Sequence, residues 1–143
     1  MKRDHEAEYR HFVMQKQLVE KHFPCFHCSL RSNVLECVGE ITPALHCDTY
    51  QLSIRYRNQG IPRVKVRHPE ILHKVHMYRD GTLCLYDFRV QPWSSWDNIH
   101  EKIIPWTAEW LVFYELYLMC GKWLGPEAPH GDGEKEAEKA LAA

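Results

Sequence analysis

The chain has 143 residues, the usual size of one domain: large enough to bury a hydrophobic core and too small for two such cores. Hydrophobic residues make up 45% of it and charged residues 26%, a globular balance that excludes disorder of the whole chain. The formal net charge of -1 gives no field that would attract nucleic acid, so we expect no nucleic-acid partner.

The first residues and the cysteines bear on where the protein works. The chain begins with charged rather than apolar residues, and no stretch approaches the ~18 apolar residues that span a bilayer. The six cysteines lack the density of a disulfide scaffold, and a chain of this size does not need one. We therefore expect a soluble cytoplasmic protein without a membrane partner, whose cysteines are free thiols.

The first half of the chain predicts a helix followed by a sheet. Residues up to about Phe23 are rich in helix formers and end at Pro24. Four extended runs follow, at residues 25–31, 34–41, 50–57 and 63–67, and the last two alternate apolar and polar side chains. Turn signals at 32–33 and 58–60 separate them, which predicts an antiparallel four-stranded meander. The expected apolar face of the helix consists of Tyr9, Phe12, Val13, Val19 and Phe23.

The second half begins with an irregular stretch and ends with a helix. Residues 68–98 have no helical period, and long irregular stretches in compact domains are usually functional. Asp97 is the expected N-cap of a short helical stretch, Pro105 suits the first turn of a longer helix, and Gly121 is expected to end it. Residues 1–130 form the predicted domain, and residues 131–143 a flexible tail. The aromatic residues at helical spacing, which we expect in the core, are Trp106, Trp110, Phe113, Tyr114 and Tyr117.

Cys84 is the strongest candidate nucleophile because it follows an Asp80-Gly81 turn, which is expected to present the thiol rather than bury it. The segment around it resembles the active-site stretch of ubiquitin-conjugating enzymes, in which a Tyr, a Gly turn and Cys-Leu occur in order; the residues that match in register are Tyr78, Gly81, Cys84 and Leu85. The resemblance covers residues 5–124. It implies an α+β, ubiquitin-conjugating-enzyme-like fold with an N-terminal helix, a four-stranded antiparallel meander, an active-site segment and a C-terminal helix.

Three segments, residues 80–86, 104–111 and 123–130, are similar to the bacterial relatives of that family found in antiphage cyclic-oligonucleotide signalling (CBASS) operons. The resemblance implies a transferase that carries an acyl group as a thioester on Cys84 and passes it to an amine. Its implied partner is a cGAS/DncV-like nucleotidyltransferase, which is a cyclic-oligonucleotide synthase, or a ubiquitin-like protein. It implies neither a cofactor nor a metal.

One departure from the family concerns the three residues that should read His-Pro-Asn. Lys74, Val75 and His76 stand there, so an imidazole occupies the place of the family's asparagine. An imidazole could donate a hydrogen bond to a developing oxyanion in its stead, which makes His76 the second catalytic candidate. The alternatives are a buried structural thiol for Cys84 and a loop-packing role for His76.

Other polar residues could assist, and other functions remain open. Tyr86, Asp87 and Asp97 could orient or deprotonate an incoming lysine, or be solvated surface groups; His73, His100 and His130 could approach the site. A non-catalytic interaction scaffold with the same fold is the main alternative to an enzyme. A weaker one is a zinc or redox protein built on Cys25 and Cys28 with His22 nearby, which lacks a second Cys/His pair at ligand spacing.

Overall fold

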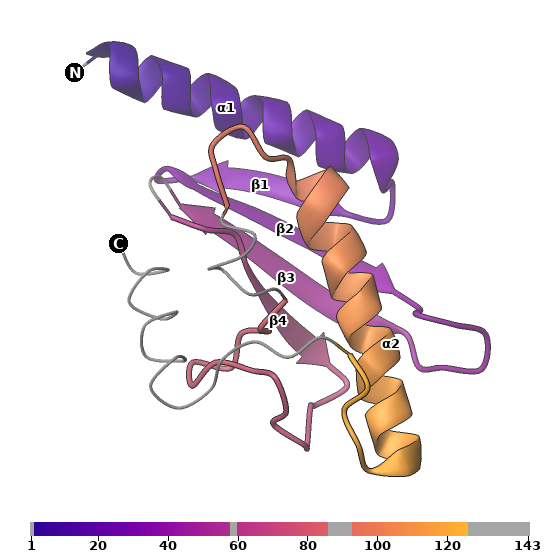
Figure 1. Cartoon of the computed structure of the whole chain (residues 1–143). Helices are drawn as coiled ribbons and strands as arrows, with labels where there is room; N and C mark the ends of the chain where they lie inside the picture. The colour runs from indigo at the N-terminus through magenta and orange to yellow at the C-terminus, as the bar shows by residue number, and fades with distance from the viewer. Residues whose placement is uncertain (1, 58–59, 86–92, 126–143) are drawn as a thin grey trace.

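The computed structural model describes residues 2–57, 60–85 and 93–125 and has the order of elements that the sequence predicts (Figure 1). The expected tail at 131–143 and the domain boundary at 130 lie outside the described residues. The elements are helix α1 (Lys2–His22), strands β1 (His27–Arg31), β2 (Val34–Ile41), β3 (Tyr50–Arg57) and β4 (Arg63–His68), the π-helix η1 (Ile99–Ile103) and helix α2 (Ile104–Cys120).

The four strands form an antiparallel meander in the order β1-β2-β3-β4. Ser32 and Asn33 join β1 to β2 with φ angles of 49° and 60°, the left-handed values of a two-residue hairpin turn. The predicted first strand began too early, because Pro24 and Cys25 form a turn and β1 starts at His27. The alternation in β3 is confirmed for its apolar side chains, since Tyr50, Leu52, Ile54 and Tyr56 are buried, but Ser53 on the polar side of the pattern is buried as well.

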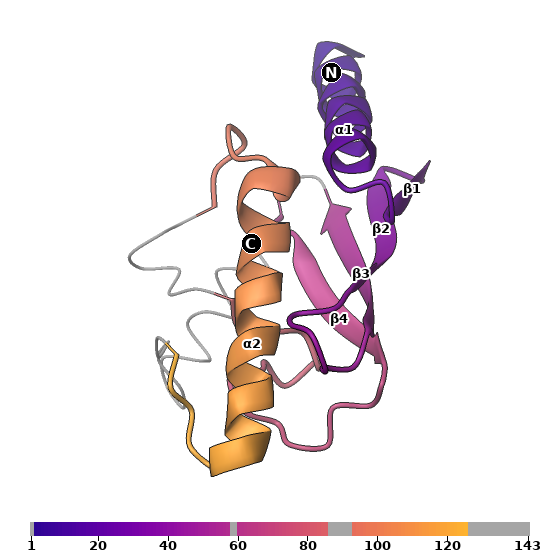
Figure 2. The ribbon, with the colours of Figure 1, turned by 90° about the vertical axis from the view of Figure 1, so that its right-hand side faces the viewer.

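Helix α2 lies across one face of the sheet, and α1 lies beside β1, as Figures 1 and 2 show from two directions. Pro105 is in the first turn of α2, and Gly121 ends the helix with a φ of 73° and an N–H that donates to the carbonyl of Tyr117. Both expectations are confirmed. The expectation for Asp97 is wrong, since Asn98 precedes η1 at the cap position and makes no side-chain capping bond.

The fully buried side chains of α1, among those that the structure describes, lie in its second half. Its buried side chains Phe12, Gln15 and Val19 are spaced three and four residues apart, whereas residues 5–11 include no buried side chain. Tyr9, expected on the apolar face, is therefore 59% exposed. Among the described residues, no helix is long and apolar enough to cross a membrane.

Candidate active site around Cys84

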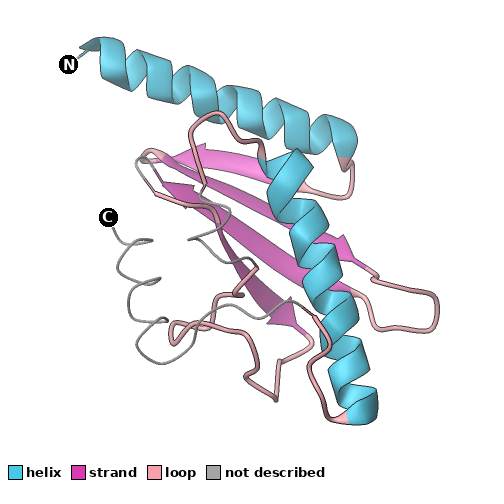
Figure 3. Cartoon of the chain, in the orientation of Figure 1, coloured by secondary structure: helices cyan, strands magenta, loops and turns pink. Residues whose placement is uncertain are grey.

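Cys84 lies at the end of a small hairpin in the stretch that follows β4. Figure 3 draws the described part of this stretch as loop. Met77 and Leu83 form an isolated antiparallel bridge, and the N–H of Tyr78 donates to the carbonyl of Thr82 at 2.8 Å. One step outward, the N–H of Cys84 donates to the carbonyl of His76 at 2.9 Å. His76 and Cys84 therefore lie opposite each other on the two arms.

The predicted Asp80-Gly81 turn is confirmed, and it anchors the hairpin to β4. Gly81 has a φ of 88°, a value that a residue with a Cβ rarely adopts. The Asp80 carboxylate accepts hydrogen bonds from the N–H and hydroxyl of Thr82 and lies 2.8 Å from a guanidinium nitrogen of Arg63. Partial burial alone would raise the pKa of Asp80, but the bonds from Thr82 and the charge of Arg63 lower it. The N–H of Leu83 donates to Val64 of β4, so the hairpin has a fixed place beside the sheet.

Cys84 itself is 7% exposed, and the neighbouring Leu83 is 4% exposed. The expectation that the turn presents an exposed thiol is therefore wrong for this conformation. The physical reason is that the hairpin folds back onto β4, where the N–H of Leu83 bonds to Val64 and the Leu83 side chain joins the apolar core. The adjacent Cys84 is therefore held close to the core as well. Tyr86 and Asp87, which were expected near the thiol, lie outside the described residues.

His76 is held by two tryptophans as well as by Cys84. Its φ of 49° is in the left-handed region, which is uncommon for residues other than Gly, although His, like Asn and Asp, adopts it more often than most. Its carbonyl accepts a second hydrogen bond, from the indole N–H of Trp110 on α2 at 3.0 Å. Its ring stacks on Trp123, with centroids 4.4 Å apart and planes at 22°. Neither tryptophan was predicted as a site residue; the signals in the sequence were that Trp110 lies in the motif at 104–111 and that Trp123 begins the motif at 123–130.

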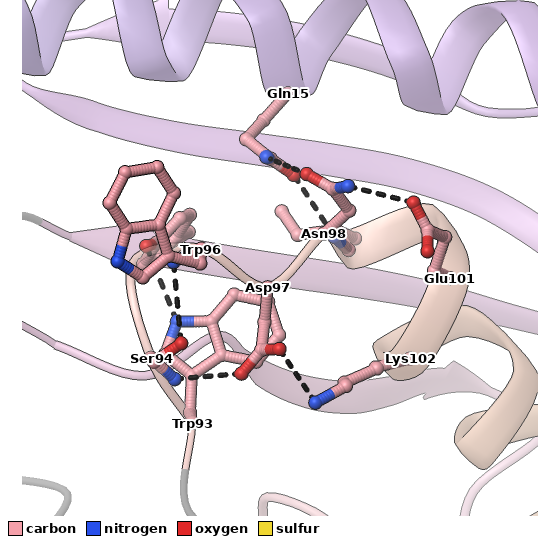
Figure 4. A network of polar contacts seen from close by, with 10 residues as sticks. Gln15, Trp93, Ser94, Trp96, Asp97, Asn98, Glu101 and Lys102 are labelled. Atoms are coloured by element: carbon pink, nitrogen blue, oxygen red, sulfur yellow. Dashed lines mark hydrogen bonds and ion pairs between the residues drawn. The ribbon is translucent and has the colours of Figure 1, made fainter.

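Asp97 belongs to a different part of the structure, the loop before η1 (Figure 4). Its carboxylate accepts the N–H of Ser94 at 2.8 Å and pairs with Lys102 at 2.6 Å. Burial opposes ionisation of this carboxyl, yet the bonds from Lys102 and Ser94 lower its pKa. These contacts give Asp97 a structural role in bracing the loop that carries Trp96, which is 91% exposed.

The same loop is tied to α1 by an amide network. Gln15, which is fully buried, donates to the side-chain oxygen of Asn98 at 2.8 Å and accepts the N–H of Ile99 at 3.0 Å (Figure 4). Asn98 in turn donates to Glu101 at 2.7 Å. The start of η1 is therefore positioned by a side chain of α1, which is 83 residues away along the chain.

The other histidines make contacts of their own. His100 stacks on His22 with centroids 4.4 Å apart, and His73 meets the ring of Tyr117 edge-on. Burial and the nearby His22 lower the pKa of His100. Neither contact involves Cys84, and His130 lies outside the described residues.

The sulfurs of Cys25 and Cys28 have separate neighbours. The thiol of Cys25 is directed at the carbonyl of Glu40, whereas that of Cys28 meets the thiol of Cys37 across the β1–β2 pair at 2.6 Å. Within residues 2–57, 60–85 and 93–125, no group of three or more His, Cys, Asp or Glu side chains could hold a metal ion. The zinc alternative therefore receives no support from the described residues.

The helix, the meander, the cysteine hairpin and the following helix together define an E2-like protein of the α+β, ubiquitin-conjugating type. The model of the family described as Type II CBASS E2 protein matches residues 15–131, and the chain belongs to this family. No curated protein shows significant sequence similarity to the chain. Membership assigns it an E2-like role in antiphage defence, together with other CBASS proteins.

Proposed function

We propose that Cys84 carries an acyl group as a thioester and transfers it to an amine. The acyl group is the C-terminus of a ubiquitin-like protein or of a cGAS/DncV-like nucleotidyltransferase, and the reaction takes place in the cytoplasm, where thiols stay reduced. The observation that carries the proposal is the pairing of His76 with Cys84 across the hairpin, in a chain of an E2-like family.

The reaction has two balanced steps. In charging, the Cys84 sulfur attacks an activated carbonyl; a C–S bond forms, the bond to the activating group breaks, and the thiol proton leaves with that group or to solvent. In discharge, an amine nitrogen attacks the thioester carbonyl; a C–N bond forms, the C–S bond breaks, and the thiolate recovers a proton from the amine. The acyl donor therefore arrives already activated.

His76 is the group best situated to favour the second step. Attack of the amine places negative charge on the thioester oxygen, and an N–H donor held near that oxygen stabilises the charge. The main chain of His76 is bonded to that of the nucleophile, so the hairpin keeps the two residues opposite each other, and the His76 ring is held by its stacking on Trp123. We propose that its imidazole N–H supplies this hydrogen bond in place of the family's asparagine amide.

One observation favours the alternative function, a non-catalytic scaffold with the same fold. Cys84 is 7% exposed, and a thiol that accepts a protein C-terminus must be reached by it. Under the scaffold function, the Cys84→Ala variant would retain full function in antiphage defence. Under the transferase function, charging requires a conformation in which the sulfur is more exposed.

Intact mass spectrometry separates the two functions. The protein is isolated from cells that co-express its genomic neighbours, with and without reductant, as wild type, Cys84→Ser and Cys84→Ala. The transferase predicts an added mass on the wild type that reductant removes, a stable oxyester on Cys84→Ser, and no adduct on Cys84→Ala. The added mass identifies the donor. Partners that co-purify with an unmodified wild-type chain would instead support the scaffold.

A further inference from the structure

His76 has a conformation that needs support from outside its own hairpin. A left-handed φ persists in a residue with a Cβ only where surrounding contacts compensate for it, and such residues cluster at functional sites. Two contacts of His76 come from tryptophans that are distant in sequence, Trp110 and Trp123. Trp110 fixes its main chain through the carbonyl, and Trp123 fixes its ring.

Trp123 reaches His76 because the chain reverses at the end of α2. Gly121 stops the helix in the left-handed conformation, and the following residues run back along it. At Gly125, a Cβ would lie 2.6 Å from the ring of Phe113, so only glycine permits this approach without a shift. The indole of Trp123 meets the rings of Trp110 and Phe113 at centroid distances of 5.6 and 5.9 Å. Trp123 is therefore packed in a fixed place beneath the His76 ring.

We infer that Trp123, assisted by Trp110, is a positioning residue for acyl transfer from Cys84. This inference rests on the proposed function and deepens it. Stacking on Trp123 restricts the rotation of the imidazole, so that its N–H is aimed before the amine arrives and no reorganisation is needed during the reaction. Trp123 does not touch the acyl group; it acts through His76.

The test is a double-mutant cycle on the discharge step. Charged protein isolated from the co-expressing cells is mixed with free lysine, and loss of the adduct mass is followed for wild type, His76→Ala, Trp123→Ala and the double variant. We expect Trp123→Ala to slow discharge by about ten- to a hundredfold. The fraction charged beforehand should be at least that of wild type, because slower discharge leaves more of the thioester intact. The double variant should discharge no more slowly than His76→Ala, because both substitutions remove the same oriented N–H.

Three further variants separate positioning from general stability. Trp123→Phe keeps a ring to stack on and should recover most of the rate. Trp110→Phe keeps an aromatic ring in the core but removes the donor to the His76 carbonyl, so it should slow discharge. This variant provides a second test if Trp123→Ala fails to fold. Trp96→Ala, at a 91% exposed tryptophan, should discharge like wild type.

Three results would overturn the inference, and they are distinguishable. If wild type carries an adduct but Trp123→Ala discharges at the wild-type rate, Trp123 does not position the site. If adding Trp123→Ala to His76→Ala slows discharge by the same factor as adding it to wild type, Trp123 does not act through His76. If no form carries an adduct, the proposed function fails first and the inference fails with it.

Discussion

The N–H of Cys84 donates to the carbonyl of His76 across 2.9 Å, so the candidate nucleophile and its candidate assistant share one small hairpin. The same carbonyl accepts the indole N–H of Trp110. A displacement of either arm of the hairpin would therefore strain the hydrogen bond to the other arm, and a displacement of His76 would also strain its bond to α2.

Thiol reactivity should divide the cysteines by exposure. Cys25 and Cys120 are exposed, whereas Cys28, Cys37 and Cys84 are buried. The bond from Cys28, together with burial, raises the pKa of Cys37 and suppresses its thiolate. We expect iodoacetamide at pH 7.5 to alkylate Cys25 and Cys120 first, and Cys28 and Cys37 only after unfolding, as followed by peptide mass spectrometry. Cys84 should also react slowly, and labelling of Cys84 as fast as Cys25 would contradict its burial.

Gln15→Ala should destabilise the fold. The substitution leaves the buried N–H of Ile99 without its acceptor and removes a donor from Asn98. An unsatisfied buried group costs about 1–3 kcal/mol, so urea unfolding should move to a clearly lower midpoint. Gln17→Ala, at an exposed position on the same helix, is the matched control and should change stability by less than about 0.5 kcal/mol. Equal losses for the two variants would show that the network contributes nothing specific.

Gly39→Ala should be destabilising through overpacking. A Cβ at Gly39 on β2 would overlap the ring of Phe26, which is 1% exposed. Overpacking of this kind costs about 1–3 kcal/mol. In the double variant Gly39→Ala/Phe26→Leu, the smaller side chain makes room, so we expect a total loss smaller than the sum of the two single losses. Simple additivity in urea unfolding would mean that the overlap is relieved elsewhere.

Stability should fall between neutral and mildly acidic pH, in part because of His100. Its pKa in the folded protein is lowered by burial and by His22, so the unfolded chain binds a proton more readily than the folded one. The contribution is present above an unfolded pKa of about 6.5 and is lost as pH falls below it. We expect His100→Gln to reduce the loss of unfolding free energy between pH 7.5 and 5.5, measured by urea denaturation. Identical losses in wild type and variant would exclude this role.

Local patterns in the sequence determined the elements and their order. The signals used were local ones: the alternation in residues 50–57, the break at Pro24, and the positions of Pro105 and Gly121. Because each acts within a few residues, the helices, strands and turns could be predicted from the sequence, with the start of β1 placed two residues too early. The motif around Cys84 also pointed to the E2-like family, to which the match over residues 15–131 assigns the chain.

The surroundings of the site depended on contacts that no local period encodes. Two of these contacts, the hydrogen bond of Gln15 to Asn98 and the stacking of Trp123 on His76, join residues that are far apart in the sequence. Cys84 is buried, although its turn alone predicted an exposed thiol. An Asp-Gly turn dictates the reversal of the main chain, but the surface against which the hairpin packs decides whether the thiol is exposed. Here β4 and the core accept Leu83, and Cys84 is buried beside it.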